Sequence, residues 1–293
     1  MIKKTPGERI FDAVNILVML FLMFITLYPL YYTVVCSFSD ARALLRHSGP
    51  LAAPLQPFTL SGYRLTMRNV SILTGFKNSI LYVLLGTSLS ILFTAMGAFA
   101  VSRKHFKFRK IMMGGILFTM FFSGGIIPLF FVVQKTGIYD TIWAMFLPWL
   151  VSTYNLIILR TFFAGIPESL EEAAMLDGAN DLHVLFRIYL PLSTSALAVL
   201  ALYYGVGIWN SWYPALVFMR TRSLYPLQMI LREVLILDTG TSVNSSAMVA
   251  EESFHRELVK YCTVVVSTAP ILVIYPFLQK YFVKGVMIGA VKG

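Results

Sequence analysis

Charged residues are scarce in this sequence. Only 13% of its 293 residues are Asp, Glu, Lys or Arg, whereas 57% are hydrophobic. In a soluble domain about a quarter of the residues are charged. The composition therefore excludes an ordinary soluble protein and predicts an integral membrane protein.

Residues that carry out chemistry are also few. The two cysteines, Cys36 and Cys262, are isolated, and the four histidines fall in loops without a partner at metal-ligand spacing. The cysteines are expected to be free thiols that pack as small apolar residues. Neither HExxH nor the nucleotide-binding pattern GxxxxGK[ST] occurs. The sequence predicts no catalytic residue, no metal and no bound cofactor, so any ATP must be hydrolysed by another chain.

Carboxylates are absent from the interior of the apolar stretches. Asp12 is the only one within them, and it lies one turn into the first stretch. A transporter driven by a proton or sodium gradient usually keeps ionisable residues inside its spans. The sequence therefore gives little support to an internal proton relay.

Six apolar stretches are long enough to cross a hydrocarbon core, which takes roughly 20 helical residues. They are about Ile10–Cys36, Ser79–Val101, Ile111–Val133, Thr141–Leu159, Ala196–Met219 and Tyr261–Val283. We expect an all-α fold with six transmembrane helices in one domain, residues 1–293. The first stretch follows a basic segment, as in a signal peptide. It is longer than a signal core and lacks a clear cleavage site, so it is expected to be retained.

Basic residues are concentrated in the short loops. They precede the first stretch, fill SRKHFKFRK between the second and third, and follow the sixth. Short cytoplasmic loops are enriched in Lys and Arg. Both termini are therefore expected inside the cell, with residues 37–78, 134–140 and 220–260 outside. The net charge of +10 fits anchoring against anionic lipid better than nucleic-acid binding.

The largest predicted cytoplasmic loop, residues 160–195, contains EEAAMLDGANDLHVLFRIYLPLS from Glu171 to Ser193. The first of two predicted helices begins at Pro167, carries glutamates in its early turns and ends at Gly178. The second begins near Asn180 or Asp181 and is closed by Pro191. Its apolar face consists of Leu182, Leu185, Phe186 and Tyr189. Helical pattern alone leaves open whether the loop docks a partner or lies on the membrane interface.

The spacing within this loop matches EAA-x3-G-x9-I-x-L-P. The matching residues are Glu172, Ala173, Ala174, Gly178, Ile188, Leu190 and Pro191. The pattern resembles the EAA loop of permease subunits in binding-protein-dependent ABC importers. The resemblance implies a type I importer permease fold, in which these residues form coupling helices seated in a groove of the ATPase. Glu172 is then expected to pair with an arginine of that ATPase.

The resemblance extends along most of the chain, and it is closest to the smaller permease of maltose-type carbohydrate importers. MFFSGGIIPLF from Met120 and LYPLQMILREVLI from Leu224 are similar to permeases for complex oligosaccharides. The tail KGVMIGAVKG is similar to one that reaches the ATPase interface in relatives. Its candidate residues are Gly289, Ala290, Lys292 and Gly293.

Polar and aromatic residues of the fourth and fifth stretches are candidates for the substrate path. Mid-span polar side chains must face protein or water, and aromatic rings can stack on sugars. The candidates are Ser152, Asn155, Tyr204, Trp209, Asn210 and Trp212. For the polar residues, helix-to-helix hydrogen bonding remains an alternative. For the tryptophans, a place in the aromatic belt at the outer membrane boundary remains an alternative.

These features predict a multi-pass permease subunit of an ATP-driven carbohydrate importer in a bacterial plasma membrane. The implied partners are a second homologous permease, a dimeric ABC ATPase, an extracytoplasmic substrate-binding protein, the carbohydrate and the lipid bilayer, without nucleic acid. The loop 220–260 is expected to contact the binding protein, although a helix lying on the outer membrane surface is also consistent with its sequence. The alternative function is a membrane-embedded enzyme or scaffold whose internal loop rests on lipid.

Overall fold

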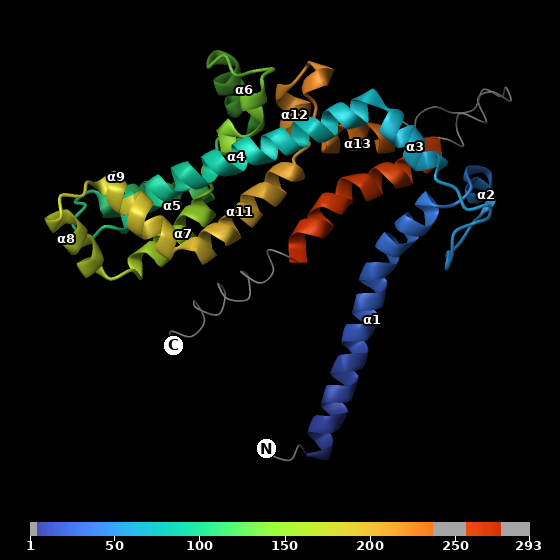
Figure 1. Cartoon of the computed structure of the whole chain (residues 1–293), viewed down its shortest axis with the longest axis horizontal. Coiled ribbons are helices and arrows are strands. Elements are labelled where there is room, and N and C mark those ends of the chain that lie inside the picture. The colour runs from blue at the N-terminus through green and yellow to red at the C-terminus, as the bar shows by residue number, and fades with distance from the viewer. Residues whose placement is uncertain (1–4, 237–255, 277–293) are drawn as a thin grey trace. The chain divides into compact units, whose positions relative to one another are not determined.

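The structure is a computed structural model that describes residues 5–236 and 256–276. These residues form helices joined by loops, and no strand occurs among them (Figure 1). The predicted all-α fold is therefore confirmed for the described part of the chain. The residues predicted to form the C-terminal contact, Gly289, Ala290, Lys292 and Gly293, lie outside the described residues. The middle of the loop 220–260 lies outside them too.

Three helices are each long and apolar enough to cross a membrane. They are α1 (Pro6–Ser37), α4 (Val70–Ser102) and the helix Arg256–Pro276. Three further candidates are pairs of shorter helices that meet the same criterion only when taken together. The described residues thus contain three to six candidate spans, depending on whether each bent pair is counted as one.

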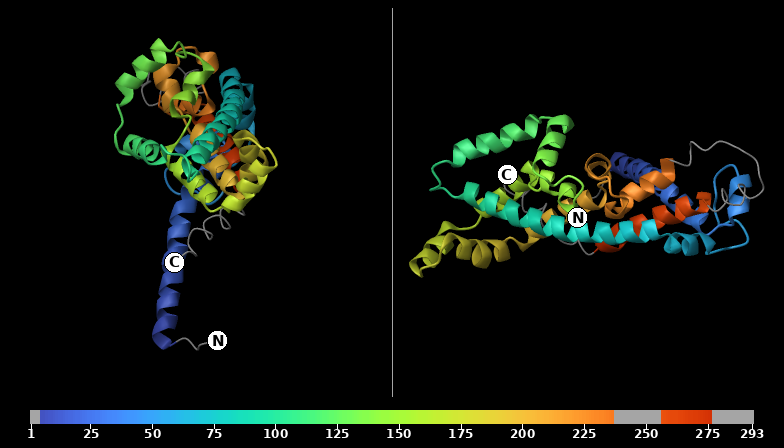
Figure 2. Two further views of the ribbon diagram at one scale, coloured as in Figure 1. Left: turned by 90° about the vertical axis from the view of Figure 1, so that its left-hand side faces the viewer. Right: turned by 90° about the horizontal axis from the view of Figure 1, so that it is seen from above.

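Two of the bent pairs fall on the third and fourth apolar stretches, and the third pair joins the end of the loop 160–195 to the start of the fifth stretch. The first pair is α5 (Arg109–Phe121) with α6 (Ile126–Lys135), bent by 116° (Figure 2). The second pair joins the 3-10 turns η1 (Ile142–Met145) and η2 (Leu147–Trp149) to α7 (Thr153–Ala164), with a bend of 58° between them. The third pair joins Asp181–Leu192 to α11 (Thr194–Trp209), with a bend of 86°. For the first two pairs hydropathy alone predicts continuous helices, because it does not register changes of direction.

Glycine permits the sharpest of these bends. Gly125 precedes α6 with φ of +80°, in the left-handed region that costs other residues free energy. In the second pair Pro148 lies within η2, the short turn before the break. Glycine and proline thus mark two of the places where an apolar stretch changes direction.

The chain divides into two compact units, the first made of residues 1–72 and 233–268. Its short helices are α2 (Ala41–Arg46) and α3 (Ser61–Arg68). The buried end of α1 packs Cys36 with Leu44 and Leu51. Cys262 is fully buried, and its thiol donates to the carbonyl oxygen of Ser37 at 3.5 Å. Neither Cys36 nor Cys262 forms a disulfide, and both are buried. This confirms the prediction that they are free thiols in apolar packing.

The second unit consists of residues 73–232 and 269–293 and holds the candidate site. Its remaining described helices are α8 (Glu168–Leu176), α9 (Asp181–Val184), the π-turn η3 (Leu185–Tyr189), α10 (Leu190–Leu192), α12 (Tyr213–Phe218), η4 (Arg222–Leu224) and most of α13 (Leu227–Ile236). Within this unit α4 and α11 lie side by side. A Cβ added at Gly86 of α4 would lie 2.7 Å from Ile208 of α11, so glycine allows the close approach.

Candidate functional site

Helix α8 ends in a glycine turn. The helix ends at Leu176, Asp177 caps it, and Gly178 follows with φ of +84°. The N–H of Gly178 donates to the carbonyl of Met175 at 3.0 Å, and the N–H of Ala179 donates to that of Ala174 at 2.9 Å. These two bonds form a Schellman motif, which satisfies carbonyls at a helix end. The predicted helix end at Gly178 is confirmed.

The second helix begins where the sequence predicts. Asn180 caps α9, because its side-chain oxygen accepts from the N–H of His183 at 2.8 Å. The helix continues through the π-turn η3 and ends after Leu192 in α10. Pro191 therefore lies within the last turn, one residue before the end, rather than closing it.

The predicted apolar face of this second helix is divided in the structure. Leu185 and Tyr189 are buried, whereas Leu182 and Phe186 are 56% and 46% exposed. Val184 is buried in their place. The wider π-turn changes the angular spacing assumed for an α-helix, which explains why the face expected from i, i+3, i+4, i+7 does not point in one direction.

The EAA residues fall into two groups, one exposed to solvent and one partly buried against the rest of the chain. Glu172, Ala173, Gly178 and Pro191 are exposed. Ala174, Ile188 and Leu190 are partly buried and pack against the core formed by α4, α7 and α11. The pattern therefore combines residues that pack the loop against the helices of this chain with exposed residues that remain available to a partner.

Large apolar side chains close in sequence to the exposed EAA residues are exposed as well. They are Leu170, Met175, Leu176, Leu182 and Phe186, and Leu176 is 89% exposed. We name this set the exposed apolar face of the loop. Exposed apolar side chains that gather in one region are typical of interaction sites.

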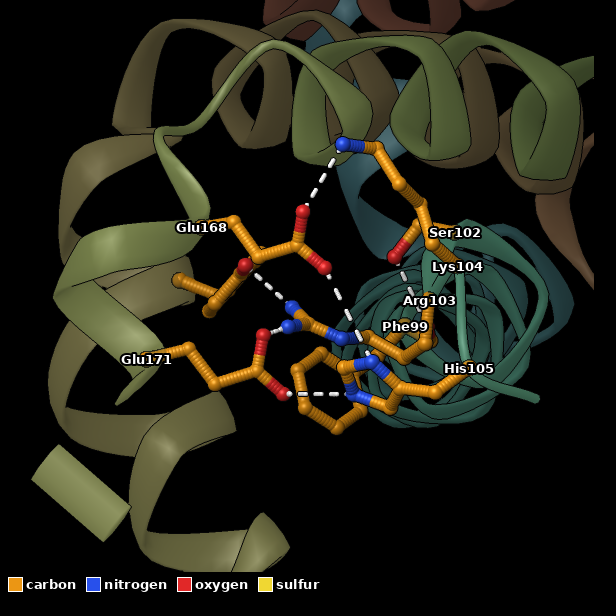
Figure 3. Close-up of polar contacts among 8 residues, drawn as sticks. Phe99, Ser102, Arg103, Lys104, His105, Glu168 and Glu171 are labelled. Atoms are coloured by element: carbon orange, nitrogen blue, oxygen red, sulfur yellow. Dashed lines mark hydrogen bonds and ion pairs between the residues drawn. The ribbon is translucent and has the colours of Figure 1, made fainter. Parts of the chain in front are cut away.

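A buried ion pair fixes α8 to the segment that follows α4 (Figure 3). The guanidinium of Arg103 contacts the carboxylate of Glu171 and the hydroxyl of Tyr189. It also lies over the rings of Phe99 and Tyr189, at 5.1 and 4.8 Å from their centroids. The side chains of Arg103 and Glu171 are only 10% and 2% exposed. Sequence reasoning assigned Arg103 only to the positive-inside cluster and Glu171 only to the helix dipole, so it missed this contact.

A second, exposed pair accompanies the buried one (Figure 3). The Lys104 ammonium donates to Glu168 Oε2 at 2.7 Å. His105 lies between the two carboxylates, with Nε2 3.5 Å from Glu171 Oε1 and Nδ1 3.7 Å from Glu168 Oε1. The hydrogen bond from Lys104 lowers the pKa of Glu168. Because Lys104 is 77% exposed, solvent screens this pair and it contributes little stability.

A cavity of about 450 Å³ opens elsewhere in the same unit. Its aromatic lining consists of Phe146, Trp149, Tyr154, Tyr203 and Tyr204. Its polar lining consists of Ser90, Ser152, Asn155 and Ser211. Three of the six substrate-path candidates, Ser152, Asn155 and Tyr204, therefore meet in one cavity. Ligand pockets commonly have about this volume and this mixture of rings and a few polar groups.

Tyr204 holds the cavity wall together through its hydroxyl. It lies 2.6 Å from the hydroxyl of Thr94 on α4, and it accepts from the backbone N–H of Ser152 at 3.0 Å. Ser152 caps α7 just after the bend, and its side chain accepts from the N–H of Asn155. Tyr204 thus connects α4, α7 and α11 at the point where the fourth stretch changes direction.

The other three path candidates lie outside this cavity. Trp209 is 6% exposed, and its ring packs edge-on against Phe76 at 5.8 Å. Asn210 is exposed at the end of α11, and the Arg232 guanidinium lies 4.8 Å from the ring centroid of Trp212. Helix geometry places Trp209 about 140° around α11 from Tyr204, so the two rings face different surroundings.

Asp140 joins two loops near α12 and η4. Its carboxylate accepts from the N–H groups of Arg220 and Thr221 at 2.8 and 2.9 Å and from the Thr221 hydroxyl at 2.7 Å. These hydrogen bonds, led by the one from the Thr221 backbone, lower the pKa of Asp140. Asp140 itself adopts φ of +56°, a conformation that Asp tolerates better than most residues.

In the described part of the chain, no group of three or more His, Cys, Asp or Glu is placed to hold a metal ion. The charged cluster around Arg103 and the neutral cavity around Tyr204 are two arrangements with functional character in this unit. The first binds one segment of the chain to another and leaves an apolar face open. The second offers rings and hydroxyls to a polar ligand.

Comparison with known proteins identifies relatives over the full length. The family model described as "Binding-protein-dependent transport system inner membrane component" matches residues 93–224. Protein LplC of Bacillus subtilis is 38% identical over 290 residues, covering 99% of this chain and 97% of the relative. The polygalacturonan/rhamnogalacturonan transport system permease protein YtcP of the same bacterium is 35% identical over 286 residues, covering 98% of this chain and 99% of the relative.

A solved structure has the same fold. One chain of a crystal structure of a bacterial ABC transporter involved in the import of the acidic polysaccharide alginate matches with a TM-score of 0.87 and 30% identity. The match covers 96% of this chain and 100% of that chain. The family match includes the loop 160–195 and all of the cavity-lining residues except Ser90.

Proposed function

Because the chain belongs to the family of binding-protein-dependent transport system inner membrane components, we propose that it translocates an oligosaccharide as one permease subunit of an ATP-driven importer. The carbohydrate assignment draws on relatives described as a polygalacturonan/rhamnogalacturonan permease and as part of an alginate importer. The loop with its Schellman turn at Gly178 and its exposed apolar face is the observation that carries the proposal. The rival function, an enzyme or scaffold, is not favoured, because the family consists of transport components.

The loop 160–195 is the proposed docking surface for a dimeric ABC ATPase. Glu172 and Ala173 are exposed on α8, beside apolar side chains that include the 89% exposed Leu176. Burying this face against a protein would gain roughly 25 cal/mol per Å² of apolar area. A partner's arginine opposite Glu172 would add a charge-assisted hydrogen bond. The tail residues Gly289, Ala290, Lys292 and Gly293 are a second proposed contact with the ATPase, on the family resemblance alone.

The cavity around Tyr204 is the proposed part of the substrate path on this subunit. Rings such as Trp149 and Tyr154 can stack on the apolar faces of sugar rings, while Ser152 and Asn155 can hydrogen-bond to their hydroxyls. A neutral lining of this kind suits a polar ligand that passes without being held tightly. A second, homologous permease would supply the other half of the path.

The proposed topology has six spans with both termini in the cytoplasm, counting each bent pair as one span. The loop 220–260 then faces outward and is the proposed contact for the extracytoplasmic binding protein. Cysteine labelling tests the orientation, after Cys36 and Cys262 are replaced. A cysteine at the exposed Ser48 should react with an impermeant maleimide in intact cells, whereas one at the exposed Lys107 should react only after lysis. The reverse pattern would refute the orientation.

Transport would follow from rigid-body motion. Closure of the ATPase dimer would pull on α8, and the two permeases would shift against each other so that the path opens alternately to each side. This chain performs no covalent chemistry in that cycle. Its task is to bind, to line the path and to transmit motion.

Reconstituted uptake tests the proposal. The chain is purified with the second permease, the ATPase and the binding protein of the same system, and the complex is placed in liposomes with labelled oligouronides or neutral oligosaccharides. We expect accumulation of one class that requires both ATP and the binding protein. An ATPase variant lacking its P-loop lysine is the control. Uptake that persists with this variant, or ATP-independent uptake, would contradict an ATP-driven importer.

A further inference from the structure

We infer that Arg103 and Glu171 form an internal brace that makes the coupling helix α8 and the inner end of α4 move as one body. The inference rests on the proposed function, since it explains how ATPase motion received by α8 would reach the substrate path. It assigns Glu171 a role different from that of its neighbour Glu172. Arg103 and Glu171 are thus positioning residues for transport and do not touch substrate or nucleotide.

The brace is buried and has several contacts. The Glu171 carboxylate is 2% exposed and contacts the Arg103 guanidinium, while His105 Nε2 lies 3.5 Å from its other oxygen. The guanidinium is also held over the rings of Phe99 and Tyr189. Removing one charge of a buried pair leaves the other without its counter-ion in a poorly solvated site, which is the costly way to break such a pair.

The brace joins segments that the chain itself connects only loosely. Arg103 follows the end of α4, whereas Glu171 lies in the first turn of α8, in a different loop. Tyr189 comes from the second helix of that loop. One guanidinium therefore binds both helices of the coupling loop to the end of α4, so a displacement of α8 is resisted unless α4 moves too.

Helix α4 leads from the brace to the cavity. It is continuous from Val70 to Ser102, and about 12 residues, or roughly 18 Å at 1.5 Å per residue, separate its end from Ser90 in the cavity lining. On the way, Thr94 contacts the Tyr204 hydroxyl at 2.6 Å, which also accepts from the N–H of Ser152. A shift of α4 would therefore displace the residues that line the path.

The two adjacent glutamates provide a sharp contrast. Glu172 is exposed, whereas Glu171 is buried within the brace. Loss of Glu172 is expected to weaken ATPase retention. Loss of the brace is expected to leave the ATPase bound but to reduce the transport that its hydrolysis produces. The two roles can be separated because retention and uptake are measured independently.

The test uses the reconstituted complex with the single variants Glu171→Gln and Arg103→Lys, the exchange pair Glu171→Arg with Arg103→Glu, and Glu168→Gln as the matched exposed control. Glu171→Gln should lower uptake per ATP hydrolysed on the order of tenfold, within the range typical of couplings between sites. ATPase retention should stay within about twofold of wild type. Arg103→Lys should retain part of the coupling, the exchange pair should recover more than either of its single changes, and Glu168→Gln should behave as wild type.

Several outcomes would overturn the brace. Wild-type coupling in Glu171→Gln would do so, as would a fall in retention parallel to the fall in uptake. Loss of the monodisperse peak of Glu171→Gln in size-exclusion chromatography would assign the pair to stability alone and would also overturn it. Failure of the proposed function is distinguishable, because the wild-type complex itself would then show no ATP-dependent uptake.

Discussion

A substitution series at Gly178 tests whether the angle between the two helices of the loop matters for coupling. Gly178 has φ of +84°, and a Cβ built on it would meet nothing within 4 Å. A new side chain would therefore find open space. Within this chain its effect on the loop would therefore come from backbone strain rather than from steric contact.

The magnitude follows from the left-handed conformation. It costs L-residues roughly 1–2 kcal/mol, least for Asn and most for β-branched residues. We expect Gly178→Asn to behave nearly as wild type, Gly178→Ala to lose about 1 kcal/mol, and Gly178→Val about 2 kcal/mol or more. Since about 1.4 kcal/mol is a tenfold change in an equilibrium constant, the valine variant should lower the population of the correct loop geometry by more than tenfold relative to its competitors.

The assay is the stimulation of ATP hydrolysis by the binding protein in the purified complex, together with uptake in liposomes. Insertion should be unaffected, so each variant is first checked for its amount in the membrane. Gly7→Ala is the matched control, because Gly7 also has open space around it but does not adopt a positive φ. The activities should fall in the order Asn, Ala, Val. Equal stimulation in all three variants would refute the reasoning.

Two further predictions concern the cavity and the loops that Asp140 joins. Tyr204→Phe removes the acceptor of the Ser152 N–H and should lower the free energy of unfolding of the complex by about 1–2 kcal/mol. Tyr154→Phe, at a ring that is 55% exposed, should lower it little. Equal losses would contradict the role of Tyr204 in connecting α4, α7 and α11. The hydrogen bonds from Thr221 lower the pKa of Asp140 below its ordinary value of 3.8, so their stabilisation is present above that pH and is lost as the pH falls through the lower folded value. The difference in melting temperature between wild type and Asp140→Asn should therefore stay constant from about pH 8 to about pH 5 and shrink only below about pH 4; a change near neutral pH would contradict it.

Local signals made the loop predictable from the sequence. Pro167 before the first helix, Gly178 after it and Asn180 before the second act within one turn of the chain, so their meaning does not depend on distant residues. The structure has α8 and α9 at the predicted places.

Tertiary contacts and changes of direction were not predictable in the same way. Nothing near Glu171 in the sequence indicates that its partner is Arg103, which belongs to another loop and was explained by the positive-inside rule. Helical rotation separates Tyr204 from Trp209, but hydropathy does not say which side faces the cavity. The bends after α5 and before α7 depend on packing as well as on Gly125 and Pro148.

The direct test of the account is whether the exposed side of α8 holds the ATPase. Glu172→Ala removes an exposed carboxylate of the motif, and Asp177→Ala removes another exposed carboxylate directly after the same helix. The quantity measured is the ATPase-to-permease ratio after detergent purification, with charge reversal of the facing arginine in the ATPase as the rescue control. Losing one partner of a buried interfacial charge pair typically costs about 2–5 kcal/mol, so Glu172→Ala should weaken retention on the order of 30-fold or more. Asp177→Ala should leave it unchanged. Equal retention in both variants would contradict the docking of the ATPase through Glu172.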